Sequence, residues 1–75
     1  MNANEIKKKH KSGELWITTA ELLSFFDMSL SQFHKFIRNN DDFPKVVMYV
    51  KIKHGAKRRF SDVYDWLVAN RYISE

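Results

Sequence analysis

Two helix-start signals lie only eleven residues apart in the stretch ITTAELLSFFDMSLSQFHKFI, residues 17–37. Thr18 is followed three residues later by Glu21, and Ser29 is followed three residues later by Gln32. In such a capping box the hydroxyl accepts a hydrogen bond from the backbone N–H three residues on, and the Glu or Gln side chain accepts one from the backbone N–H of the capping residue. Two such signals so close together restrict this part of the chain to two short helices joined by a tight turn.

We expect the first helix over residues 19–26 and the second over residues 30–39. Only residues 27–29 remain for the connection, and two short helices joined this tightly are typical of a helix-turn-helix. Met28 is the apolar residue of the turn and is expected to fill the gap between the helices. The apolar stripe of the second helix consists of Leu30, Phe33 and Ile37, at positions i, i+3 and i+7.

A strand-like pattern follows in residues 45–53, where apolar side chains recur with a period of two. Residues 54–56 would form a turn, residues 57–60 would return as a second strand, and Ser61 would cap a last helix. One face of this strand consists of Val46, Met48, Val50 and Ile52, and the hairpin is expected to lean on the helices through Met48, Val50, Ile52 and Phe60. The order helix, turn, helix, β-hairpin, helix predicts an α+β fold, mainly α, of the winged helix-turn-helix kind.

The first 13 residues are polar and basic and end in Ser12-Gly13, so we expect residues 1–13 to be a flexible basic arm and residues 14–75 to be one domain. The chain has no cysteine, which excludes disulfides and thiolate metal sites and suits a reducing cytoplasm. No apolar run reaches the roughly 20 residues of a membrane span, and no signal-peptide pattern is present. We therefore expect a cytoplasmic protein without a membrane partner.

The positive charge is concentrated in two places. The net charge is +4, yet residues 45–60 contain six basic side chains and no acidic one, and residues 1–14 contain four lysines against two glutamates. Positive charge concentrated in this way creates an electrostatic field that favours a polyanionic partner, such as nucleic acid or an acidic membrane surface. The alternative is a solvated basic face without a partner.

If the partner is double-stranded DNA, the second helix would lie in the major groove and its outward side chains would read base edges. Gln32 suits adenine, whereas Lys35 and Arg38 suit guanine or phosphate. An ordinary solvated helix face is the alternative for Gln32, Lys35 and Arg38, and the alternative for His34 is that it caps or packs. The predicted contacts are Ser29, Ser31, Gln32, His34, Lys35 and Arg38, with Thr18 and Thr19 against the DNA backbone at the start of the first helix.

The basic hairpin would follow the phosphates or enter the minor groove as a wing. Arg58 has the same strand parity as Phe60, so an ion pair with Asp62 or another helix carboxylate is the alternative for it. Tyr49 shares a strand face with lysines and is expected to be exposed. The predicted wing contacts are Lys51, Lys53, His54, Lys57, Arg58 and Arg59.

Aromatic residues make up 15% of the chain, which raises the alternative of a base-stacking platform for single strands. Their helical spacing and the small size of the domain favour a core role instead. The three histidines fall in three different elements, without an HExxH pattern, and the chain has no glycine-rich phosphate loop. We therefore expect a protein that is not an enzyme and that needs no metal or cofactor.

Three pieces of the chain together resemble a known family: WITTAELLSFFDMSLSQFHKFI, DDFPKVV and RRFSDVYDWL. Their order and spacing are similar to those of the AlpA-like prophage regulators and the related small excisionases, which share a MerR-type helix-turn-helix. The resemblance covers about residues 15–70. It departs at Asp27, where the family usually has glycine, and in the longer hairpin. The positions that fit are Thr18, Leu22, Leu23, Met28, Ser29, Phe33, Ile37, Phe43, Pro44, Lys45, Arg59, Phe60, Asp62, Val63 and Trp66.

The resemblance implies a DNA-binding accessory protein of a prophage or other mobile element. Such proteins act as recombination directionality factors that bend DNA and steer an integrase toward excision, or they regulate promoters of the element. The resemblance also implies that several copies bind adjacent repeats. Because the sequence has no heptad and no evident exposed apolar stripe, we expect a monomer in solution that associates cooperatively on DNA. The alternative is a protein-interaction module, such as an anti-repressor or an adaptor for an integrase or polymerase.

Overall fold

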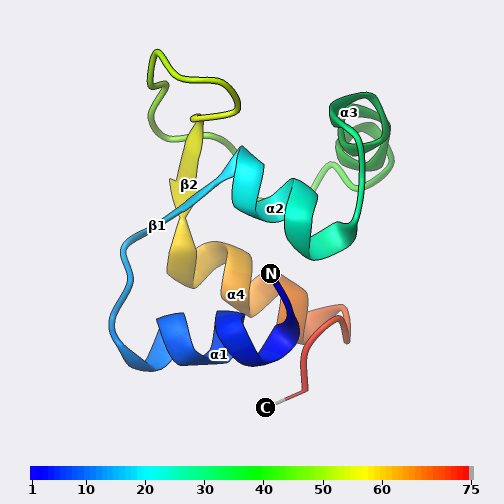
Figure 1. The fold of residues 1–75 in the computed structure, drawn as a ribbon. Helices are drawn as coiled ribbons and strands as arrows, with labels where there is room; N and C mark the ends of the chain where they lie inside the picture. The colour runs from blue at the N-terminus through cyan, green and yellow to red at the C-terminus, as the bar shows by residue number, and fades with distance from the viewer. Residues whose placement is uncertain (75) are drawn as a thin grey trace.

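The computed structural model describes residues 1–74, which form four helices and a two-stranded antiparallel sheet (Figure 1). The predicted α+β class, mainly helical, is therefore confirmed. In chain order the elements are α1 (Ala3–Lys11), β1 (Trp16–Thr18), α2 (Thr19–Phe26), α3 (Leu30–Asn39), β2 (Lys57–Arg59) and α4 (Phe60–Ala69).

Both predicted capping boxes are present, and they place the starts of α2 and α3 where the sequence predicts them. Thr18 Oγ1 accepts from the Glu21 N–H at 3.2 Å, and Glu21 Oε1 accepts from the Thr18 N–H at 3.0 Å. The second box repeats this arrangement between Ser29 and Gln32. Asp27 ends α2 in the left-handed region with φ 54°, a conformation that aspartate tolerates better than most residues.

The prediction that residues 1–13 form a flexible arm is wrong for most of that segment, because residues 3–11 form α1. Asn2 and Glu5 make a third capping box at its start. Ile6 is 0% exposed, and the ring of His10 stacks on that of Tyr64 with centroids 3.8 Å apart. The buried Ile6 and the stacked His10 dock α1 on the rest of the fold, although most of the helix is polar.

The predicted hairpin also differs from the structure, because β2 forms its ladder with β1, and residues 45–53 reach β2 only at Lys57. Ile17 lies opposite Arg58 in this sheet, and the far edge of β2 carries only an isolated bridge from Met48 to Lys57. Residues 44–56 otherwise form an irregular loop, drawn at the upper left of Figure 1. The apolar face expected to be buried is exposed in part, and Ile52 is 65% exposed.

Two hydrogen bonds from the start of α2 explain why residues 45–56 do not form the predicted strand and turn. The Thr19 N–H donates to the Ala56 carbonyl and the Ala20 N–H donates to the His54 carbonyl, both at 3.0 Å. A helix leaves its first N–H groups without intrahelical partners, so carbonyls from outside the helix satisfy them favourably. These bonds hold residues 54–56 against α2 and away from a regular hairpin ladder.

The last helix begins one residue before the predicted cap. Arg59 is at the N-cap position of α4 and makes no side-chain cap hydrogen bond, so Ser61 is not the cap. Phe60, which is buried, donates its N–H to the Leu15 carbonyl at 2.9 Å and so ties the helix start to the strand layer. The predicted core positions of α4, Val63, Trp66 and Leu67, are all buried.

Most aromatic side chains serve the interior, as the sequence predicts. Phe43 contacts Trp66 edge to face with centroids 4.9 Å apart, and Phe26 contacts Phe36 at 4.8 Å. Such pairs each contribute about 0.5–1.5 kcal/mol beyond their burial. The buried apolar residues are Ile6, Ile17, Leu22, Phe33, Phe43, Phe60, Val63, Tyr64, Trp66, Leu67 and Ile73.

Candidate nucleic-acid interface

The outward face of α3 carries three polar side chains in one row. Ser31, Lys35 and Arg38 are all exposed and follow one another at i, i+4 and i+7. On the opposite face Phe33 is buried, which fixes the rotation of the helix. A rigid helix that presents one serine and two cations outward has the chemistry needed to contact phosphates and guanine edges.

Two other predicted contacts of α3 are already engaged within the protein. Ser29 Oγ accepts from the Gln32 N–H at 3.2 Å, and Gln32 Oε1 accepts from the Ser29 N–H at 2.8 Å. A bidentate contact with adenine uses both the oxygen and the nitrogen of an amide. Because the oxygen of Gln32 is held in the cap, only its NH₂ group is free to donate, and Gln32 is a weaker candidate for base readout than Arg38.

Thr18 and Thr19 are not placed for a contact with the DNA backbone. Thr19 is buried, and its hydroxyl accepts a hydrogen bond from Arg58. The Thr18 hydroxyl is half-buried and belongs to the cap of α2. The N–H groups at the start of α2 already donate to Thr18 and to the loop carbonyls, so this helix end does not offer donors to a phosphate.

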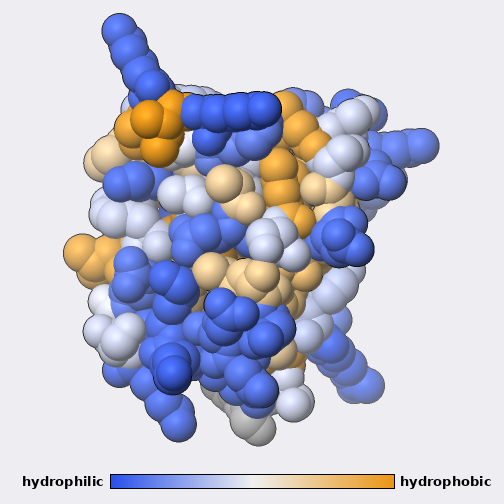
Figure 2. Space-filling view, viewed as in Figure 1, coloured by the Kyte–Doolittle hydropathy of each residue, from blue (hydrophilic) through white to orange (hydrophobic). Residues whose placement is uncertain are grey.

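The basic loop, residues 45–54, is the second exposed part of the predicted interface. Lys45, Lys51 and Lys53 are exposed, and Tyr49 is 83% exposed, as the strand alternation predicts. Figure 2 shows long hydrophilic side chains beside hydrophobic surface at the upper left, over this loop. Lysines with apolar neighbours on one loop suit a surface that binds an anionic partner, because the lysines attract the partner and the apolar side chains exclude water from the contact.

The structure separates Arg59 from this loop. Its side chain lines a different depression, together with His10, Glu14 and Ser61, at the junction of α1 and α4. Lys57 is half-buried in the strand. The predicted wing set is therefore divided, and Lys51 and Lys53 are its members that project freely from the loop.

Arg58 is another predicted contact that lies in the interior and not at the surface. It is 5% exposed and packs against both Phe33 and Phe43, with its guanidinium carbon 5.3 and 5.5 Å from the two ring centroids. Arg58 shares strand parity with Phe60, which indicated that its side chain points inward. The carboxylate partner expected for it is not found, since the one ion pair within residues 1–74 joins Lys9 and Glu21. Arg58 is thus a buried cation rather than a wing contact.

Hydrogen bonds compensate only part of the burial of Arg58. Its Nε–H donates to the Pro44 carbonyl at 2.8 Å, and its Nη1–H donates to Thr19 Oγ1 at 3.2 Å. Burial lowers the pKa of the Arg58 guanidinium, and the nearby Tyr49 raises it to a lesser extent. The side chain still remains a cation at neutral pH, because arginine is not deprotonated in proteins.

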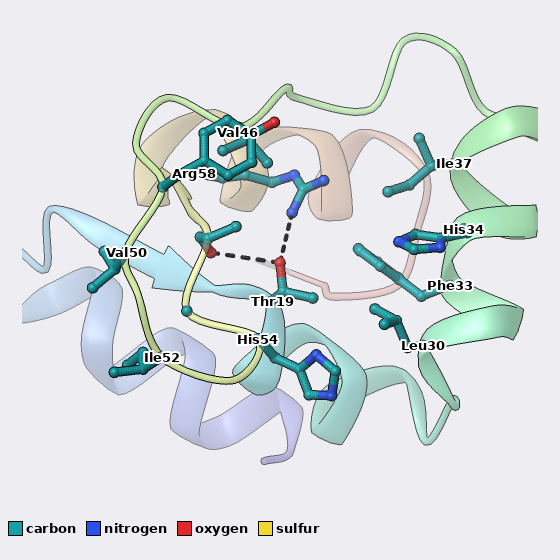
Figure 3. A pocket seen from close by; sticks show the side chains of 13 residues that line it. Thr19, Leu30, Phe33, His34, Ile37, Val46, Val50, Ile52, His54 and Arg58 are labelled. Atoms are coloured by element: carbon teal, nitrogen blue, oxygen red, sulfur yellow. Dashed lines mark hydrogen bonds between the residues drawn. The ribbon is translucent and has the colours of Figure 1, made fainter.

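A cleft of about 390 Å³ lies between α3 and the basic loop (Figure 3). His34, Ile37 and Leu30 project into it from α3, and Val50, Ile52 and His54 line it from the loop. Arg58 and Thr19 form its inner end. His34 and His54 therefore face one cleft, which their separation in the sequence does not indicate.

Residues 1–74 hold no cluster of three or more His, Cys, Asp or Glu side chains that could share a metal ion. None of the helices in this part of the chain combines the length and the apolar character needed to cross a bilayer.

No family model matches the chain, and no curated protein or solved structure matches it. The resemblance to the AlpA-like regulators and excisionases therefore stays a prediction from the sequence motifs.

Proposed function

We propose that this protein binds double-stranded DNA as a winged helix-turn-helix, with α3 in the major groove and the basic loop along the backbone. The observation that carries the proposal is the row of Ser31, Lys35 and Arg38 on the outward face of a helix that is capped and rotationally fixed. The loop of residues 44–56 takes the place of the predicted hairpin wing. Lys51 and Lys53 would neutralise phosphates.

The motif resemblance supports a narrower assignment within this class. We propose an accessory protein of a mobile element, acting as an excisionase or as a promoter regulator, with no enzymatic activity and no cofactor. Its partners would be DNA and an integrase, and its location would be the cytoplasm. Copies would associate cooperatively on adjacent sites. Bending a short site costs about 1–6 kcal/mol by elastic estimates, which contacts from both α3 and the loop must offset.

The decisive experiment is sequencing of genomic fragments captured by the purified protein at moderate salt. Enrichment of clustered repeats beside an integrase gene would support the excision role. Enrichment at promoters alone would support regulation. Capture without any enriched sequence would contradict base readout by α3.

A second candidate is a protein-interaction module, and one observation favours it. Val47, Met48, Tyr49 and Ile52 are exposed apolar side chains on one loop, and a patch of this kind is typical of an interface with another protein. Absence of DNA binding even at low salt, together with a specific complex with an integrase or polymerase, would favour this module over the DNA-binding function.

A further inference from the structure

The buried cation Arg58 leaves part of its hydrogen-bonding capacity unused. Its two hydrogen bonds come from Nε and Nη1, and no described residue accepts from Nη2. Among residues 1–74, Trp66 Nε1 is the one fully enclosed side-chain polar atom without a partner, so Nη2 is not sealed off. The free side of the guanidinium therefore meets the cleft that Arg58 lines.

A cation that is 5% exposed and has no carboxylate partner among residues 1–74 is costly to bury unless something neutralises it. Aromatic contacts with Phe33 and Phe43 and two neutral acceptors provide partial compensation. An anionic group at the inner end of the cleft would neutralise Arg58 and accept a charge-assisted hydrogen bond from it.

The walls of the cleft determine what kind of anion fits. They are mainly apolar, with contributions from Leu30, Ile37, Val46, Val50 and Ile52, and the volume lies within the range of small-molecule sites. His34 and His54 add two polar groups that can donate N–H hydrogen bonds. A phosphate of duplex DNA is a poor match. The duplex is too wide to enter the cleft, so its backbone contacts exposed cations and does not reach the buried Arg58.

We propose that this cleft is a binding site for a small organic anion, with a carboxylate or phosphate group on Arg58 and an apolar body between α3 and the loop. The site is independent of the proposed DNA-binding function. Because α3 and the loop are its two walls, an occupant would also fix their relative position.

The test is an NMR titration of the ¹⁵N-labelled full chain without DNA. The measured signals are the chemical shifts of the backbone amides that line the cleft and of the Arg58 Nε–H. The probes are phenylacetate, phenyl phosphate, the neutral phenylacetamide and inorganic phosphate. We expect saturable shifts confined to the cleft for the two organic anions, with dissociation constants of about 1 mM or tighter. Phenylacetamide and inorganic phosphate should each bind at least about tenfold more weakly, because each lacks one of the two recognised parts.

Variants of the loop keep the test separate from folding, because Arg58 itself supports the fold. Val50→Asp places a carboxylate in the cleft and should weaken both organic anions at least about tenfold. Val47→Asp is the matched control, since Val47 is exposed on the same loop and does not line the cleft. Equal binding of phenylacetate and phenylacetamide, equal effects of the two variants, or no shift confined to the cleft would overturn the proposal.

Discussion

Arg58 Nη1 donates a 3.2 Å hydrogen bond to Thr19 Oγ1, joining the strand before α4 to the first residue of α2 across 39 positions of sequence. The same threonine donates its backbone N–H to the Ala56 carbonyl in the loop. One buried residue therefore connects β2, α2 and the loop. These are the elements that bring α3 and the basic loop to opposite sides of one cleft.

Removing the Thr19 hydroxyl should destabilise the fold without changing the size of the side chain. We expect Thr19→Val to lower the free energy of unfolding by about 1–3 kcal/mol, since it removes an acceptor from a buried charged donor. Urea denaturation monitored by the fluorescence of the two tryptophans, Trp16 and Trp66, measures this. Thr19→Ser keeps the hydroxyl and is the control. Equal losses in the two variants would mean that packing, and not the hydrogen bond to Arg58, accounts for the effect.

The packing of α1 predicts a large effect at one position of the N-terminal segment. Ile6→Ala should lower the free energy of unfolding by about 2–5 kcal/mol, because it removes a fully buried side chain from the core. Lys8→Ala is the control, since Lys8 is exposed on the same helix and should change stability by less than about 0.5 kcal/mol. If residues 1–13 were a flexible arm, chemical denaturation would give the same result for both variants.

The cap of α3 provides a test within a single turn of helix. Ser29→Ala should reduce the stability of the protein by about 1 kcal/mol, since the Gln32 N–H loses its acceptor. Ser31→Ala serves as the control because Ser31 is exposed and lies outside the cap. Thermal unfolding by circular dichroism compares the two, and a larger loss for Ser31→Ala would contradict this assignment of the cap.

DNA binding should respond differently to changes on α3 and on the loop. Lys53→Ala should lower affinity for all sequences and reduce the slope of log K against log salt by about 0.9, the effect of one lost phosphate contact. Arg38→Ala should instead cost about 1–3 kcal/mol on the preferred site and little on other sequences. Fluorescence anisotropy at about 50 to 200 mM salt measures both quantities.

The control for this prediction is Lys8→Ala, which removes a lysine from α1, outside the proposed interface. It should leave both the sequence preference and the salt slope near their original values. If Arg38→Ala and Lys53→Ala weaken every sequence equally, α3 does not read bases, and the positive charge acts only as a general attraction.

The sequence by itself determined the features that depend on near neighbours. The capping boxes of α2 and α3 and the apolar faces of the helices arise from side chains within a few positions of one another, so spacing alone reveals them. The exposed row on α3 follows in the same way, because burial of one helix face decides where the other points.

Only the tertiary structure decided the features that depend on distant partners. The alternation in residues 45–53 predicts a strand, yet a strand needs a partner, and β1 already occupies one edge of β2 while α2 holds residues 54–56 by their carbonyls. The burial of Arg58 and the docking of α1 likewise depend on residues far along the chain. A periodic pattern states which side chains share a face, whereas long-range contacts decide what that face meets.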